Sequence, residues 1–130
     1  MTILVLIGCE KKNNFDSLEG LNIETPEGLV NWDVIKVEGP TSALVNATIS
    51  FDVYCPSSSG CDYISKFVSD KNGNTIFIKA FGNTQIDSPC TMAAVPIIAK
   101  YEFTSNLKGQ FVLKFINRDN SVIKHFLTIQ

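Results

Sequence analysis

Four cysteines and one histidine are the residues of this chain whose types could do chemistry. Cys9 lies near the N-terminus, Cys55, Cys61 and Cys90 follow in the middle of the chain, and His125 is close to its end. Cysteine thiols form disulfides, bind zinc or act as nucleophiles. A structural zinc site needs four ligands at closed spacing, and three cysteines with one distant histidine fit that pattern poorly. We therefore expect structural roles for these residues and predict no metal, no cofactor and no catalytic residue.

The residues around Cys9 change from apolar to polar at a single position. Residues 1–8, Met-Thr-Ile-Leu-Val-Leu-Ile-Gly, are almost wholly apolar, and Glu-Lys-Lys-Asn-Asn follows the cysteine. Such a boundary is typical of the end of a signal peptide, where an apolar segment and a small residue precede the mature chain. The run Leu6-Ile7-Gly8-Cys9 resembles the lipobox of bacterial lipoproteins.

The resemblance to the lipobox implies a modification and a location. In that family the cysteine is joined by a thioether to a diacylglycerol and the preceding peptide is removed, so Cys9 would begin the mature chain. Each buried methylene adds about 0.8 kcal/mol of membrane affinity, so two or three acyl chains hold a protein firmly. We therefore expect a lipid-anchored protein of the bacterial cell envelope, on the outer membrane and facing the periplasm or the cell surface.

Residues 1–8 are shorter than a complete signal peptide. Such peptides have a positively charged start and an apolar region of roughly 7–15 residues. Here no Lys or Arg precedes Cys9, and the apolar stretch has only about five residues. We infer that the printed start lies inside a longer signal peptide. The alternative is that Ile3 to Ile7 form a first β-strand and that Cys9 is an ordinary core thiol.

The rest of the chain divides at about residue 30. Residues 9–29 are polar and weakly patterned, with Gly20, Pro26 and Gly28 as breakers, as expected of a lipid anchor and flexible tether. From residue 30 onward apolar and polar residues alternate, which is the period of half-buried β-strands. We therefore expect a truncated signal peptide in 1–8, a tether in 9–29 and one folded domain in 30–130, a length that suits a single domain.

The domain is predicted to be all-β, an antiparallel Ig-like sandwich of seven to eight strands. Ile49, Phe51 and Val53 alternate with polar residues, and Asn72-Gly73 is a hairpin-turn signal between two such segments. Turn signals recur every 8–12 residues, and no segment has helical periodicity. The predicted strands are 34–37, 47–54, 63–69, 75–81, 97–104, 110–116 and 121–129, with the apolar run 90–96 as a further candidate.

Two cysteines and a late aromatic strand follow one another in the second half of the domain. Cys61 precedes the hairpin, Cys90 follows it, and the strand Gly109-Gln110-Phe111-Val112-Leu113-Lys114-Phe115 comes later. This layout is similar to the Ig-like domains of small lipoproteins of unknown function, in which two cysteines and a Gly-aromatic-x-Leu-x-Phe strand recur. The resemblance covers about 70 residues, and it implies a fold and no activity.

Three cysteines remain once Cys9 is lipidated. An oxidising compartment allows disulfides, and an odd number of cysteines leaves one thiol without a partner. Strand directions place Cys55, Cys61 and Cys90 near one end of the domain, so the geometry permits any pairing. Cys61–Cys90 closes a loop of about 30 residues, worth about 3–4 kcal/mol, and Cys55–Cys61 closes about seven residues, worth about 2.4 kcal/mol. Cys55–Cys90 also stays open, as does the absence of any bond within the chain. The resemblance to the Ig-like lipoproteins favours Cys61–Cys90, which leaves Cys55 over.

Two further groups of polar residues are candidates for binding or catalysis. His125 alternates with three aliphatic residues on the last predicted strand, so we expect a partly buried, hydrogen-bonded ring. Asp70, Asn72 and Asn74 alternate as calcium-loop ligands do, but the glycine precedes the third ligand and no terminal Glu follows. We interpret these three residues as a hairpin turn.

The apolar run Met92–Ala99 is a candidate interaction surface. Because it does not alternate, it is either a strand buried on both faces or an edge strand that a partner can extend. Burial is the simpler interpretation. Pro96 favours an edge or a bend, since proline lacks the N–H that a central strand needs.

The net charge and the absence of catalytic motifs exclude some classes of function. The formal net charge is −2, and no basic patch is visible, so we expect no nucleic-acid partner. The best interpretation is a non-enzymatic Ig-like binding or structural module, with an envelope protein or a glycan as partner. One alternative is an inhibitor or accessory factor of an envelope enzyme. The other is a thiol-dependent redox protein that pairs the leftover thiol with His125.

Overall fold

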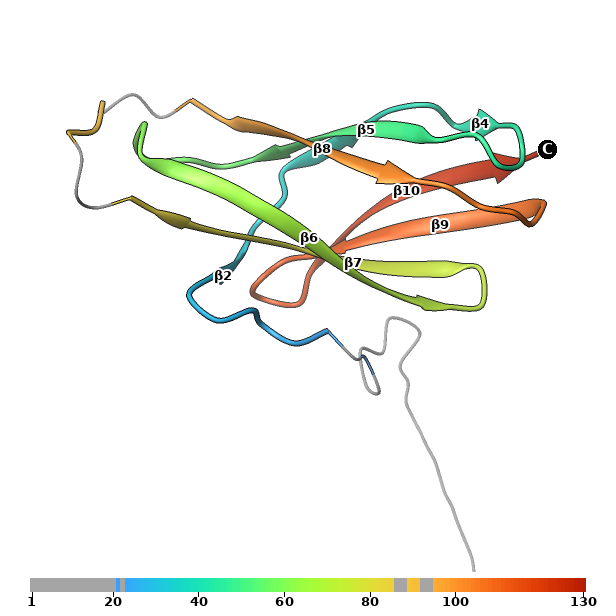
Figure 1. The fold of residues 1–130 in the computed structure, drawn as a ribbon, viewed down its shortest axis with the longest axis horizontal. Coiled ribbons are helices and arrows are strands. Elements are labelled where there is room, and N and C mark those ends of the chain that lie inside the picture. The colour runs from blue at the N-terminus through green and yellow to red at the C-terminus, as the bar shows by residue number, and fades with distance from the viewer. Residues whose placement is uncertain (1–20, 22, 86–88, 92–94) are drawn as a thin grey trace, which may run out of the picture.

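The chain folds into two β-sheets that pack face to face (Figure 1). The computed structural model describes residues 21, 23–85, 89–91 and 95–130, and this part of the chain contains no helix. The all-β prediction is therefore confirmed. The nine strands of the described part are β2 (Val30–Trp32), β3 (Lys36–Glu38), β4 (Ser42–Ala43), β5 (Ile49–Cys55), β6 (Asp62–Asn72), β7 (Thr75–Thr84), β8 (Ile97–Phe103), β9 (Gly109–Ile116) and β10 (Val122–Ile129).

The larger sheet is built around β7. It runs in the order β2-β7-β9-β10-β4, and β6 pairs with β7 as well. One edge of β7 carries β6 along its whole length, while the other edge pairs with β9 at 75–78 and with β2 at 80–82. The smaller sheet has the order β3-β5-β8. As a result β6 and β8 are both edge strands, one in each sheet.

The topology differs from the prediction of seven to eight antiparallel strands. There are nine strands among the described residues, and two pairings, β4 with β10 and β7 with β9, are parallel. The two additional strands, β2 and β4, have three and two residues, which is too short to show an alternating pattern. Alternation indicates which face of a strand is buried and does not indicate which strand lies beside it.

The hairpin between β6 and β7 is present, but its turn lies one residue later than expected. Asn72 pairs with Thr75, so the central residues of the turn are Gly73 and Asn74. Gly73 has a φ of 64°, a left-handed conformation that glycine adopts without steric cost. Placing glycine first in a two-residue turn is typical of type II′ hairpins.

A β-bulge in β6 decides which of its side chains face the core. The register with β7 shifts after Ile64, because Ser65 is an extra residue on β6. Ile64 and Phe67 are three positions apart and would otherwise point to opposite faces, yet both pack against the core. Gly82 lies opposite the bulge, where a Cβ atom would collide with the carbonyl oxygen of Tyr63. Glycine at this position therefore permits the close approach of the two backbones.

Aromatic rings fill the core between the two sheets. Phe51 of β5 and Phe111 of β9 are buried, as the alternating pattern predicts. Phe67, Tyr101 and Phe115 form an aromatic trio, with ring centroids 5.4, 5.7 and 6.5 Å apart in edge-to-face contacts. Because the trio comes from β6, β8 and β9, it joins the two sheets at the side where β6 and β8 are the edges.

We expect the aromatic trio to contribute strongly to the free energy of unfolding. Phe115 is fully buried, and Phe115→Ala should destabilise the fold by about 3–5 kcal/mol because it leaves a cavity between the sheets. Phe126, which is 67% exposed on β10, is the matched control, and Phe126→Ala should change stability by no more than about 0.5 kcal/mol. Urea unfolding followed by circular dichroism measures both values. Similar losses for the two variants would contradict this packing.

Candidate functional site

The predicted lipid attachment site, Cys9, lies outside the described residues, as do residues 1–8 and the first part of the tether. The described part, residues 23–29, contains no strand and ends in a turn in which the Leu29 N–H donates to the Pro26 carbonyl. The described part of the chain has no helix that is long and apolar enough to cross a membrane. The lipobox therefore remains a prediction from the sequence.

Cys61 and Cys90 form a disulfide, with their Cα atoms 5.2 Å apart. This confirms the pairing that the family resemblance favours. Two backbone hydrogen bonds accompany it, from the Gly60 N–H to the Thr91 carbonyl at 2.9 Å and from the Gln85 N–H to the Cys61 carbonyl at 2.9 Å. The disulfide and these bonds fix the segment that follows β7 to the start of β6.

The third thiol, Cys55, is the last residue of β5 and is free and fully buried. Burial raises the pKa of the Cys55 thiol to about 11, and the negative charge of Asp33 adds to the effect. The thiolate is the form that acts as a nucleophile or binds metals, and such a pKa leaves almost none of it at neutral pH. Cys55 is therefore poorly suited to thiol chemistry.

The His125 ring is half-buried and hydrogen-bonded, as the sequence predicts. Its Nε2 lies 2.9 Å from the Pro40 carbonyl oxygen, and because a carbonyl only accepts, Nε2 carries the proton. The ring also meets the edge of Phe51, with the centroids 5.0 Å apart. Phe51 comes four residues before Cys55 on β5, a distance of about 13 Å along an extended strand. The fold therefore does not bring the leftover thiol and the imidazole together.

The residues that resemble a calcium loop have a structural role in the hairpin. The Asn74 side-chain amide donates to the Gln110 carbonyl at 3.0 Å, and the Asn74 carbonyl accepts from the Val112 N–H at 3.0 Å. Asn74 thus fastens the β6–β7 turn to β9. Within the described residues no group of three or more His, Cys, Asp or Glu side chains is arranged to hold a metal ion.

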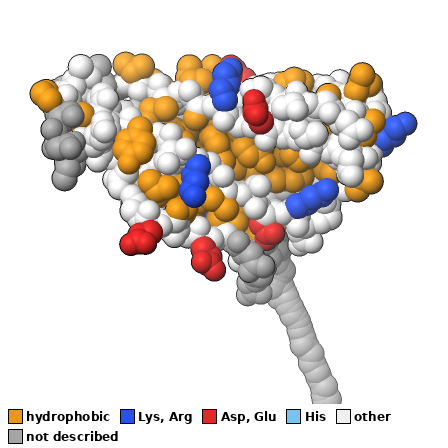
Figure 2. Space-filling view, in the orientation of Figure 1, with side chains coloured by type: hydrophobic (Ala, Val, Ile, Leu, Met, Phe, Trp, Pro, Cys, Tyr) orange, Lys and Arg blue, Asp and Glu red, His pale blue; other side chains and the backbone are white. Residues whose placement is uncertain are grey.

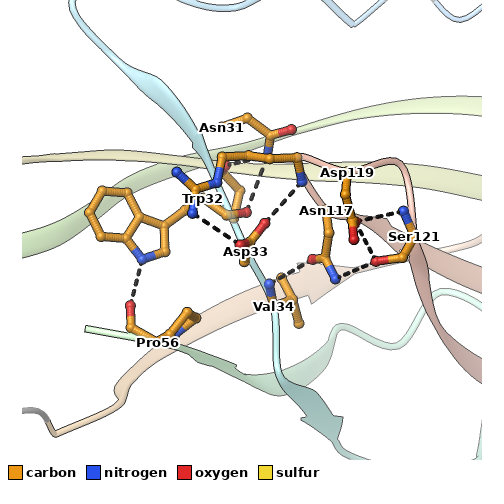
Figure 3. Close-up of polar contacts among 10 residues, drawn as sticks. Asn31, Trp32, Asp33, Val34, Pro56, Asn117, Asp119 and Ser121 are labelled. Atoms are coloured by element: carbon orange, nitrogen blue, oxygen red, sulfur yellow. Dashed lines mark hydrogen bonds and ion pairs between the residues drawn. The ribbon is translucent and has the colours of Figure 1, made fainter. Parts of the chain in front are cut away.

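A network of polar contacts surrounds the point where the chain passes from β2 in one sheet to β3 in the other (Figure 3). Asp33 accepts hydrogen bonds from the Arg118 backbone N–H at 2.9 Å and from its guanidinium at 3.1 Å. The Val34 N–H donates to the Asn117 side-chain oxygen at 2.8 Å. The bond from the Arg118 backbone is the main cause that lowers the pKa of Asp33. This crossing is thereby held against the β9–β10 hairpin.

A polar cleft of about 350 Å³ opens beside this crossing. The Trp32 indole N–H donates to the Pro56 carbonyl at 2.7 Å. The Asp62 carboxylate accepts from the Thr84 hydroxyl at 2.6 Å and from the Ser58 N–H at 2.9 Å, and the Thr84 bond is the main cause that lowers the pKa of Asp62. Because each of these polar groups already has a partner in the chain, we interpret the cleft as a structural joint.

A larger groove, of about 540 Å³, lies between β6 and β8. It is lined by residues 64–67 of one strand and 97–102 of the other. Figure 2 shows hydrophobic side chains gathered along the middle of this face, between the two sheets. β8 pairs with β5 on one side only, and on its other side no described residue forms a backbone hydrogen bond with positions 97–103. The groove therefore combines a lining of both apolar and polar side chains with an unpaired strand edge.

The exposure of β8 decides between the two interpretations of the run Met92–Ala99. Residues 92–94 are outside the described part, but Ile98 is 54% exposed and Val95 is 64% exposed. The expectation of a strand buried on both faces is wrong for the described portion, because β8 lies at a sheet edge and every second side chain faces outward. Pro96 directly precedes β8, where its missing N–H removes no bond from the ladder.

Comparisons with known proteins return no relative for this chain. A scan of protein-family models, a search of the curated proteins and a search of the solved structures each found no match. The groove between β6 and β8 is therefore the candidate binding surface on the evidence of its own geometry.

We expect the burial of Cys55 to make stability pH-dependent in the alkaline range. The pKa in the folded state, about 11, lies above the ordinary value of 9.0, so the folded state holds this proton more tightly than the unfolded state does. The resulting stabilisation is complete below pH 9 and is lost as the pH rises towards 11. Relative to Cys55→Ala, the wild type should lose about 2–3 kcal/mol over that interval.

Urea unfolding of both proteins at several pH values between 8 and 11, without oxygen, measures this difference. The wild type and Cys55→Ala share all other groups that titrate in this range. The stability difference between the two proteins therefore reports on Cys55 alone. A stability difference that stays constant across the interval would show that Cys55 is not held in a buried, protonated state.

Proposed function

We propose that this chain is a lipid-anchored protein of the bacterial cell envelope, and that its β-domain binds a protein partner without catalysing a reaction. The groove between β6 and β8 is the observation that carries the binding role. It places an unpaired strand edge beside a cleft of apolar and polar side chains, and an extended segment of a partner can contact both at once.

The state of the β8 edge supports binding to a protein. Unpaired N–H and C=O groups on an edge strand attract other strands, and soluble proteins usually protect such edges with prolines, charged side chains or a covering loop. Along β8 the outward-facing side chains are Ile98, Lys100 and Glu102, so the edge carries one charge of each sign, and no proline interrupts the strand. A partner strand with complementary charges can therefore pair with this edge. The polar cleft is a weaker candidate for a glycan, because its indole, carboxylate and hydroxyl groups are already bonded within the chain.

The tether gives the domain reach from the membrane. If Cys9 carries the lipid, about 20 residues separate it from Val30, the first residue of β2, and such a segment spans at most about 70 Å when fully extended. This length lets the domain contact partners beyond the lipid surface. The polar and glycine-containing composition of residues 9–29 suits that role.

We also propose that the sandwich is a variant of the Ig-like fold. The β3-β5-β8 sheet, the β9–β10 hairpin and the parallel pairing of β4 with β10 are the elements that support this assignment. The variant part is the β6–β7 hairpin. Its second strand lies beside β9 in parallel, so β6 is left at the sheet edge.

We expect Cys9 to be the only lipidated residue. Cells that express the chain behind a complete signal peptide should incorporate an alkyne analogue of palmitate into the wild type and not into Cys9→Ser, because acylation in lipoproteins depends on that cysteine. Cys55→Ala is the matched control and should retain the label, since it removes a buried thiol. Fluorescence after coupling of the alkyne to a dye reports the result, and labelled Cys9→Ser would refute the anchor.

We expect the groove to contact a protein in the cell. A photo-crosslinking amino acid at Ile98 should give a discrete adduct after irradiation of intact cells, because this side chain lies beside the unpaired edge. The matched control is Phe126, a large apolar residue that is also more than half exposed, lies on β10 and is outside the groove. Mass spectrometry of the adduct identifies the partner. The same products from both positions, or none from either, would count against a binding role for the groove.

A further inference from the structure

We propose that the partner strand at β8 is the β8 strand of a second copy of this chain. The two strands would pair in antiparallel orientation about a two-fold axis at Tyr101 and join two three-stranded sheets into one. This inference rests on the proposed function, since it names the partner for the same unpaired edge. The pattern of charges along the strand carries it.

The pleat of β8 limits where the axis can lie. Side chains of β8 alternate, with Tyr101 buried and its neighbours Lys100 and Glu102 exposed on the outer face. Residues opposite each other in an antiparallel pair point to the same face. An axis that passes between two residues would therefore set an outward side chain against an inward one, so the axis has to pass through a residue.

The charges along β8 then decide which residue lies on the two-fold axis. An axis at Tyr101 sets each residue against the one equally far from Tyr101 in the other copy, so Lys100 faces Glu102 of the second copy and Glu102 faces its Lys100. An axis at Lys100 would oppose two lysines, and an axis at Glu102 would oppose two glutamates, both of which are unfavourable. The register at Tyr101 is thus the one that pairs opposite charges, and it does so twice.

The ion pairs around β8 indicate which contact a second copy would add. Lys100 is already paired within the chain, since its ammonium group contacts the Asp52 carboxylate on β5. Glu102 lies opposite Ser50, and among the described residues no cation forms an ion pair with it. In the dimer, Lys100 of the second copy would stand beside Glu102. The acidic and basic side chains would then alternate from β5 of one copy across both β8 strands.

Charge reversal tests the pairing. Sedimentation velocity of the full chain in a density-matched mild detergent should show a dimer for the wild type. Glu102→Lys and Lys100→Glu should each weaken dimerisation by about tenfold or more, because each sets like charges against one another twice. The matched controls are Glu27→Lys and Lys79→Glu, which make the same charge changes outside β8 and should dimerise like the wild type.

A mixture of the two reversed variants makes the test specific. When Glu102→Lys is mixed with Lys100→Glu, every lysine faces a glutamate across the axis, so a dimer should form again. A general loss of folding would not be repaired by mixing. Thermal unfolding of each variant confirms that it is folded, and failure of the mixture to dimerise would overturn the register.

Cysteine crosslinking measures the register without changing any charge. Ile98 and Thr104 lie equally far from Tyr101, so in the paired strands they face each other at about 4.5–5.5 Å between Cα atoms, a distance that a disulfide spans. Ile98→Cys mixed with Thr104→Cys should therefore give a covalent dimer under mild oxidation. Ile98→Cys alone should not, since the two copies of this position lie far apart along the strands.

The outcomes separate this inference from the proposed function. A monomeric wild type at all accessible concentrations, together with crosslinking from Ile98 to a different protein in cells, would overturn the dimer and leave the binding role standing. A monomer with no crosslink from Ile98 would overturn both. A dimer that both reversed variants retain would place the contact on another surface of the chain.

Discussion

The two sheets hold together by side-chain packing, since no hydrogen-bonded ladder in the described structure joins one sheet to the other. The aromatic trio of Phe67, Tyr101 and Phe115 provides this packing at the side where both sheets end. Edge-to-face ring contacts add about 0.5–1.5 kcal/mol each to the burial of apolar surface. The trio keeps β6 and β8 close to each other. The groove exists because the side chains of the two strands are in contact in the core, whereas their backbones are not hydrogen-bonded to each other.

Much of the fold could be predicted, because most strands bury one face and so alternate. The segments around Phe51 and Phe111 were predicted as strands for this reason, and the observed strands begin and end within a few residues of the expected ones. The same reasoning misses β2 and β4, which are too short to alternate. It also misses the bulge at Ser65, since an extra residue changes the side-chain face without leaving a compositional sign.

The candidate site was less accessible from the sequence, because it depends on which strands become neighbours. Pro96 did indicate an edge, and β8 is one. The edge position of β6 follows from the parallel pairing of β7 with β9, which no periodicity encodes. The polar contact of Asp33 with Arg118 joins residues far apart in the chain, so only the folded structure reveals it. For the cysteines, the family resemblance indicated the Cys61–Cys90 pair, and the complete burial of Cys55 is new information from the structure.

The parallel pairing of β4 with β10 has a consequence for how the chain reaches its folded state. It joins Ser42 and Ala43 to Thr128 and Ile129, so one of the earliest strands to be synthesised finds its neighbour only among the last. Contacts between such distant segments slow folding, because the loop entropy is lost before the contacts form. If the chain crosses a membrane starting from its N-terminus, β4 arrives without its neighbour, and it stays unpaired until β10 follows.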